Sequence, residues 1–157
     1  MKRFFVVCAC LLFFLCATGC GNKARGVKTE YVEGVVKLDG AIVPEGTSVR
    51  FLPVTEGKGE PAGGFTDMNG VYRLSSVNGA PEKGAVEGEY KIVLSQVIPT
   101  ANYDENDPKA PKDARGNVII PTKELMPQSY TQKRSTPLTY TVVQGKQTHD
   151  IELSSKP

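Results

Sequence analysis

Cysteine is the residue type in this chain best suited to covalent chemistry, and it is confined to one segment. All four cysteines lie within the first 20 residues, at Cys8, Cys10, Cys16 and Cys20. An apolar run from Phe4 to Ala17 surrounds the first three and follows Lys2 and Arg3. A cationic start, a short apolar run and a small-residue end are typical of a secretory signal peptide. The run is shorter than the roughly 20 residues that a membrane-spanning helix needs, which disfavours an uncleaved anchor.

The end of this segment, Ala17-Thr18-Gly19-Cys20, resembles the lipobox of bacterial lipoproteins. The resemblance implies that the Cys20 thiol receives a diacylglycerol, and that a signal peptidase recognises Ala17, Thr18 and Gly19 and cuts before Cys20. Residues 1–19 would then be a cleaved lipoprotein signal peptide. Palmitate-type acyl chains would anchor Cys20, and more than one chain is needed for stable membrane attachment. Gly21, where an inner-membrane retention signal would have Asp, favours the outer membrane.

The predicted mature chain has few residues suited to catalysis. Its one sulfur, at Cys20, would be lipidated, so no disulfide can form and the fold must rest on its core. His149 is the single histidine. Ser-His-Asp, Cys-His and His-rich metal sites are therefore hard to assemble. The sequence predicts no catalytic residues, no cofactor and no enzymatic activity. A hydrolase with paired carboxylates is the least favoured alternative, because no such pair stands out.

The charge balance argues against nucleic acid as a partner. Lys2 and Arg3 account for two of the 19 basic residues, so the remaining 17 balance the 17 acidic residues. No basic stripe of the kind that binds a phosphate backbone is present in the sequence.

Two groups of polar residues are candidate binding sites. Asp67 and Asn69 lie in the motif D-x-N-G, which opens calcium loops, but the strand-like residues after Gly70 favour a turn with locally bonded side chains. A charged stretch could hold a cation or contact a partner, and basic side chains among its acids favour a solvated loop over a metal site. Its candidate residues for a partner-binding loop are Asp104, Glu105, Asp107, Lys109, Lys112 and Arg115, with Asp113 as a further acid.

Three ring-bearing residues have structural interpretations. His149 alternates in phase with Ile151 and Leu153, which predicts a place at the rim of the core. Tyr130 and Tyr140 are expected to pack inward with hydroxyl groups bonded at the sheet edge, and a sugar-stacking platform is the alternative.

The elements that must position these residues are short strands separated by turn signals. Alternating apolar residues or β-rich runs occur at 31–38, 41–43, 47–53, 71–74, 88–96, 136–143 and 148–153. About seven such strands without helical periodicity predict an all-β fold, a single antiparallel β-sandwich over residues 31–155. Residues 20–30 are expected to form a lipidated tether, and Gln144-Gly145-Lys146 a hairpin turn. The predicted core is Val36, Leu38, Val49, Phe51, Val71, Tyr72 or Leu74, Tyr90, Ile92, Leu94, Leu138, Tyr140, Val142, Ile151 and Leu153.

The segment 97–135 interrupts this pattern as a long charged insertion. Insertions of this length are functional or disordered in most compact domains. The apolar groups 118–120 and 125–127 are expected to hold its return path against the sandwich.

The strand and turn motifs resemble the carboxypeptidase-regulatory-like, transthyretin-like β-sandwich of small bacterial lipoproteins. The resemblance rests on GVVKLDGAIVPEGTSVRFLP (34–53), GGFTDMNGVYRL (63–74), GAVEGEYKIVLS (84–95) and the tail 130–153. Ile42 and Glu87 stand where the family has proline. The resemblance implies an immunoglobulin-like sandwich and a non-catalytic accessory or binding domain, although fold alone does not define function.

The sequence therefore predicts an exported lipoprotein that is anchored to a cell-envelope membrane and acts as a non-catalytic binding or structural module. The expected partners are membrane lipid, through acylated Cys20, and an envelope protein or glycan. Two alternatives stay open. One is an accessory subunit of an envelope transport or assembly complex, and the other is a peptide- or glycan-binding protein.

Overall fold

The computed structural model describes residues 27–57, 59–76, 84–104 and 107–156, and this part of the chain is all-β, as predicted. Among these residues, no helix has the length and apolar content needed to cross a bilayer. The elements are β1 (Val32–Leu38), β2 (Ala41–Ile42), β3 (Ser48–Pro53), β4 (Ala62–Phe65), β5 (Val71–Arg73), β6 (Ser75–Ser76), β7 (Gly88–Ser95), β8 (Val97–Pro99), β9 (Thr122–Glu124), the 3₁₀ helix η1 (Gln128–Tyr130), β10 (Thr139–Val142), β11 (Gln147–Thr148) and β12 (Ile151–Leu153).

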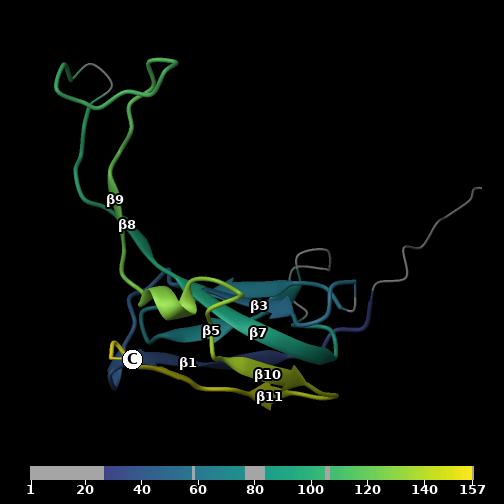
Figure 1. Ribbon diagram of the computed structural model, residues 1–157. Helices are drawn as coiled ribbons and strands as arrows, with labels where there is room; N and C mark the ends of the chain where they lie inside the picture. Colours follow the sequence, from purple (N-terminus) through teal and green to yellow (C-terminus); the bar gives the residue numbers. More distant parts are fainter. Residues whose placement is uncertain (1–26, 58, 77–83, 105–106, 157) are drawn as a thin grey trace, which may run out of the picture.

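Two five-stranded sheets form the body of the domain and lie in two layers (Figure 1). In the first sheet, β1 pairs antiparallel with β2 and β5, and parallel with β11 and β12. The second sheet has the order β10-β7-β3-β4-β6, and its pairs are antiparallel. The architecture is that of a β-sandwich. The sequence predicted an antiparallel sandwich, and this part of the prediction is wrong for β1, which pairs in parallel with β11 and β12.

The core forms where the alternating apolar residues of the two sheets face each other. In β3, Val49 and Phe51 are fully buried while Arg50 between them is exposed, which is the period of two expected for a strand. Most of the predicted core is buried, but Leu38, Leu138 and Tyr140 are only partly buried at its margin, and Val71 is partly buried and lies outside the core cluster. Further core residues that the pattern did not predict are Val32, Val43, Ala62, Ala85 and Met126.

The described core lies wholly between the start of β1 and the end of β12. Its members run from Val32 to Leu153. The fragment 27–157 therefore contains every described core residue, and it is the part of the chain used in the tests below.

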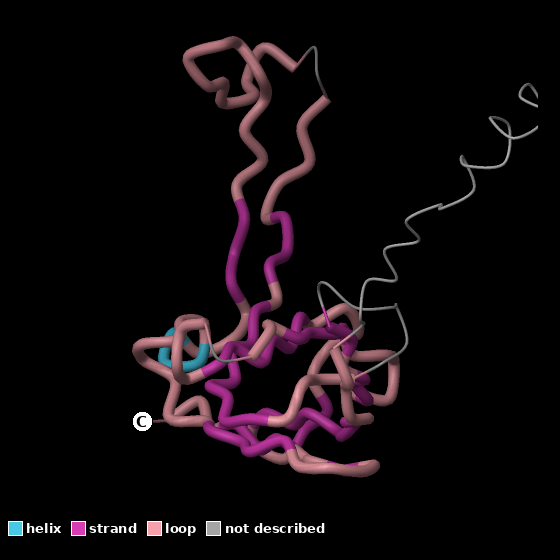
Figure 2. The backbone as a smooth tube through the Cα atoms, turned by 90° about the vertical axis from the view of Figure 1, so that its right-hand side faces the viewer, coloured by secondary structure: helices cyan, strands magenta, loops and turns pink. Residues whose placement is uncertain are grey.

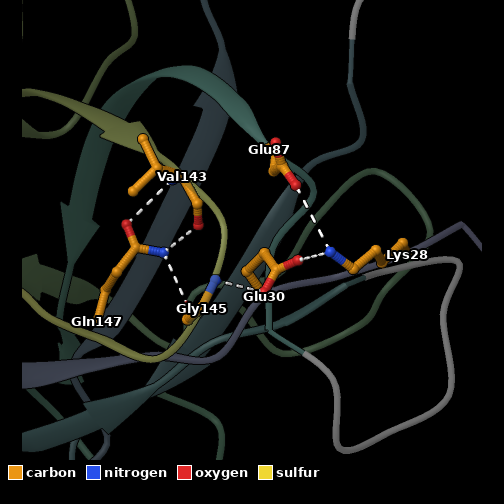
Figure 3. A network of polar contacts seen from close by, with 6 residues as sticks. All are labelled: Lys28, Glu30, Glu87, Val143, Gly145 and Gln147. Carbon is orange, nitrogen blue, oxygen red and sulfur yellow. Dashed lines mark hydrogen bonds and ion pairs between the residues drawn. The ribbon is translucent and has the colours of Figure 1, made fainter.

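The predicted closing hairpin is wrong, because the strands on either side of Gln144-Gly145-Lys146 belong to different sheets. β10 pairs with β7, whereas β11 and β12 pair with β1. The Gln147 side chain organises this crossing: its Oε1 accepts from the Val143 N–H at 3.1 Å and its Nε2 donates to the Val143 carbonyl at 2.6 Å (Figure 3). A side-chain amide thus supplies the hydrogen bonds that a paired strand would have supplied in a hairpin.

A second crossing closes another edge of the sandwich. The short strands β5 and β6 follow each other with only Leu74 between them, yet β5 pairs with β1 and β6 pairs with β4. Gly64 allows this close approach, because a Cβ atom at that position would lie 2.1 Å from the carbonyl oxygen of Arg73.

Between β11 and β12 the ladder with β1 is interrupted at His149. The carbonyl oxygen of His149 accepts the hydroxyl of the buried Tyr72 at 2.7 Å. The Val35 N–H instead donates to the Asp150 carboxylate at 2.9 Å. Gly34 is required beside this distortion, because a Cβ atom there would lie 1.9 Å from the His149 oxygen.

Replacing Tyr72 by Phe keeps the ring but removes the donor for the His149 carbonyl. We expect the free energy of unfolding to fall by about 1–3 kcal/mol, the usual effect of a buried polar group left unsatisfied. Urea denaturation of residues 27–157 measures it. Tyr103→Phe is the matched control, because the Tyr103 hydroxyl has no hydrogen bond within the described chain, and its effect should stay below about 0.5 kcal/mol. Equal losses in the two variants would contradict the assignment.

Candidate functional site

A β-ribbon arm, defined here as residues 97–124, extends from one end of the second sheet and is the most distinctive surface of the domain (Figure 2). Its paired part is β8 and β9, in which Val97 faces Glu124 and Pro99 faces Thr122. Beyond the strands, the Thr100 N–H donates to the Pro121 carbonyl at 2.8 Å. The charged insertion predicted from the sequence therefore contains an ordered projection.

Glu124 fixes the base of the arm. Its carboxylate accepts hydrogen bonds from the Ser95 hydroxyl at 2.5 Å, the Gln96 N–H at 2.7 Å and the Met126 N–H at 2.9 Å. Burial opposes the charge, but these donors outweigh it and lower the pKa of the Glu124 carboxyl. Sequence reasoning missed Glu124, because a single acid after Lys123 carries no distinctive signal.

Asp113 organises the tip of the arm. Its carboxylate accepts from the N–H groups of Arg115 and Asn117 and from the Asn117 amide, at 2.8 to 2.9 Å. The hydrogen bonds from Asn117 are the largest cause that holds the pKa of Asp113 below its usual value. Asp107 caps a second turn by accepting the Lys109 N–H at 2.8 Å. The tip is therefore built from side-chain-to-backbone bonds rather than from an apolar core.

The arm exposes aliphatic side chains that no part of the described domain covers fully. Val97, Ile98, Ile119 and Ile120 are 52%, 36%, 47% and 46% exposed. The prediction that residues 118–120 hold the return path against the sandwich is wrong, because Ile119 donates its N–H to the Pro111 carbonyl within the arm. The second predicted group does pack: Met126 is buried in the core.

The predicted partner-binding residues gather near the tip of the arm. Glu105 lies outside the described residues, and the others are Asp104, Asp107, Lys109, Lys112 and Arg115. In the described part of the chain, no three His, Cys, Asp or Glu side chains group as metal ligands. The tip thus presents acids and bases together rather than one sign of charge.

The candidate calcium motif forms a tight turn. Asp67 Oδ1 accepts the N–H groups of Asn69 at 2.8 Å and Val71 at 3.0 Å. Gly70 has a φ of 71°, and its N–H donates to the Asp67 carbonyl. These bonds match the turn interpretation of the motif.

The rings of His149, Tyr130 and Tyr140 contribute to packing. His149 is half-buried and stacks on Tyr140 with ring centroids 4.1 Å apart, and its edge meets Phe51 at 6.5 Å. Tyr130 is buried and accepts the Ser154 N–H at 3.2 Å. The expected rim position of His149 and inward packing of Tyr130 are therefore both found.

The amino-terminal end of the domain lies at the opposite end of β7 from the arm. Glu30, just before β1, pairs with Ala85, just before β7, and its carboxylate binds the Lys28 ammonium and the Gly145 N–H, each at 2.7 Å (Figure 3). The arm begins after Ser95, the last residue of β7. Eight extended residues separate the two ends by roughly 26 Å.

The predicted lipidation site, Cys20, and its recognition residues Ala17, Thr18 and Gly19 lie outside the described residues. Comparison with known protein families, with curated proteins and with solved structures finds no match to this chain. The resemblance to transthyretin-like lipoproteins therefore stays a prediction.

The environment of His149 predicts how stability depends on pH. Burial is the main cause that lowers the pKa of His149, and the nearby Asp150 charge only partly opposes it. The unfolded chain therefore binds the imidazole proton more tightly than the folded chain, and the free energy of unfolding should fall as pH decreases below the ordinary histidine value of 6.5.

Denaturation of residues 27–157 between about pH 7 and about pH 5 checks this, since carboxyl groups with lowered pKa titrate below that window. His149→Gln, which stays neutral, should flatten the dependence. An unchanged slope in this variant would refute the role of His149.

Proposed function

We propose that the chain is a lipid-anchored cell-envelope lipoprotein whose β-sandwich is a non-catalytic binding module, with the β-ribbon arm as its contact for an envelope protein. One observation carries this proposal: the hydrogen-bonded ribbon of the arm exposes four aliphatic side chains and leaves the domain at the end of β7 remote from Glu30. The lipobox resemblance supplies the anchor, and the short tether leaves the arm on the side remote from the membrane.

The energetics of the arm support a binding role. An isolated two-stranded ribbon is marginally stable in water and gains nothing from exposed isoleucines. Glu124 and Asp113 nevertheless hold the ribbon in one shape. A preordered element loses little conformational entropy when it binds, so its exposed side chains contribute more of their burial energy to affinity.

The edges of the ribbon favour contact through side chains. β8 ends with Pro99, which has no N–H to offer, and β9 carries Lys123 at its centre. Proline and lysine are the residues that commonly block edge-to-edge strand pairing. The exposed aliphatic side chains of the arm, flanked by the mixed charges of the tip, are therefore the proposed contact.

The finer fold assignment belongs to the same proposal. The motifs shared with transthyretin-like sandwiches lie on β1 to β5, β7 and β10 to β12, while the arm lies outside them. Within that family an accessory or binding role is implied. An accessory subunit of a transport or assembly complex is the second candidate, and it is favoured by the same arm if the partner is a membrane complex.

Intact-mass measurement of the protein extracted from its native membrane tests the anchor. We expect a chain that begins at Cys20 and carries acyl groups. Cys20→Ala should leave the leader attached and remove the acyl mass, because the sulfur is the acceptor. A native product that begins elsewhere, or that carries no acyl group, would contradict the lipoprotein assignment.

Site-specific photo-crosslinking in intact cells tests the arm. A photoreactive residue at Ile119 should give a discrete adduct with another protein, and Ile98→Ser with Ile120→Ser should reduce that adduct at least several-fold, because buried aliphatic contacts of this size are worth about 1.5–3 kcal/mol each. Val143 is the control position, being 53% exposed but near the tether end. Equal labelling from Val143 would argue against a contact specific to the arm.

A further inference from the structure

A groove of about 410 Å³ lies on the outer face of the second sheet, over β3 and β4. The residues that shape it are Arg50 and Leu52 on β3, Gly63 and Phe65 on β4, and Arg73 and Ser75. Its surface is largely apolar, and none of its lining residues is acidic. Nothing in the sequence predicts this groove, because 57–64 has the composition of a glycine-rich connection.

Gly63 creates the groove. In β4 the buried Ala62 points into the core, so Gly63 faces outward, between Arg50 of β3 and Ser75 of β6 in the register of the sheet. A side chain here would cover the floor. Its φ is not positive, and a Cβ atom would lie 3.5 Å from Arg50 Cγ and 3.2 Å from the Val49 carbonyl oxygen, a tight contact that a shift of a few tenths of an ångström relieves.

The two glycines of β4 therefore have different causes. Gly64 is required by the Arg73 carbonyl, which a Cβ atom would meet at 2.1 Å, whereas at Gly63 the nearest backbone atom, at 3.2 Å, would have to move only slightly. Phe65, next on the same face, is 68% exposed. An open floor beside an exposed aromatic ring is an arrangement that a folding role does not explain, and it leaves space for an apolar group to stack.

The charges around the groove specify the sign of a ligand. Arg73 already faces Glu33, with Nε 3.4 Å from its carboxylate, and lies 4.0 Å from Asp67. Arg50 is exposed and has no acidic partner within the described chain. A guanidinium without a counter-charge at the rim of an apolar surface is well suited to pair with a carboxylate.

We propose that this groove binds the carboxyl terminus of a peptide whose last side chain is large and apolar. The side chain lies on Gly63 against Phe65, and the terminal carboxylate pairs with the Arg50 guanidinium. The groove's volume is in the range of sites for small ligands, and a mostly apolar lining with few polar groups is typical of them. This inference rests on the groove alone and is independent of the lipid anchor and the arm.

Nuclear magnetic resonance titration of residues 27–157 with acetyl-Gly-Gly-Phe tests the site. We expect shifts centred on the amides of Gly63, Gly64 and Phe65. The same peptide with an amidated terminus should bind about fivefold more weakly or worse, because a charge-assisted bond to Arg50 is lost. Shifts centred elsewhere, no shifts, or equal binding of the acid and the amide would overturn the proposal.

Two variants separate the parts of the site. Arg50→Gln should reduce the affinity for the acid to that for the amide, while the exposed Arg134→Gln should leave it unchanged. Gly63→Val should weaken both peptides by filling the floor, with a thermal melt to show that the domain is folded. If Gly63→Val unfolds, the comparison of Arg50→Gln with Arg134→Gln still decides, and equal effects of these two would refute the role of Arg50.

Discussion

The hydroxyl of Tyr72 reaches the carbonyl oxygen of His149 at 2.7 Å, and this contact joins residues that are 77 positions apart in the chain. Two other buried tyrosines act in the same way. Tyr90 donates to the Glu60 carbonyl, 30 positions away, at 3.3 Å, and Tyr130 accepts from the Ser154 N–H, 24 positions away. No cysteine follows Cys20, so disulfides cannot provide such connections in the domain. Large rings that bury apolar area and end in a hydrogen-bonding group supply them instead.

The rings also connect the two layers of the sandwich. Phe51 of the second sheet lies 6.1 Å from Tyr72 of the first and 6.0 Å from Tyr90 of its own sheet, measured between ring centroids. Because the Tyr72 hydroxyl occupies the His149 carbonyl, the β1 ladder takes the Asp150 carboxylate as a substitute acceptor. The strand break between β11 and β12, the glycine at position 34 and the buried Tyr72 therefore meet at one carbonyl, that of His149.

The positions of the strands could be predicted from the sequence, but which strands pair with each other could not. The period-two pattern of β3 and β7 is local, so the core positions could be read directly. A turn such as Gln144-Gly145-Lys146 looks the same whether it joins paired strands or crosses between sheets, and the outcome depends on distant partners, β7 and β1. The ribbon structure of the arm could not be predicted for a similar reason. A polar, proline-rich composition does not show that the Asp113 and Glu124 carboxylates each accept hydrogen bonds from several backbone N–H groups. For Cys20 the situation is the opposite. The lipobox resemblance depends only on neighbouring residues, and these lie outside the part of the chain that the structure describes.

The two sheets differ in how tightly backbone contacts constrain their residues. The first sheet contains β1 and β12, so it holds both ends of the folded chain, and its geometry is constrained at Gly34 and His149 by backbone contacts that leave no room for change. The second sheet carries the arm at the end of β7 and the groove over β3 and β4. Its outward residues are free of such constraints, because Val49, Phe51, Ile92 and Leu94 satisfy the core from the other face of the same strands. An alternating strand can therefore keep one face for stability while the opposite face stays open to solvent, and both surfaces proposed here for recognition, the arm and the groove, lie on the sheet that does not contain β1 and β12.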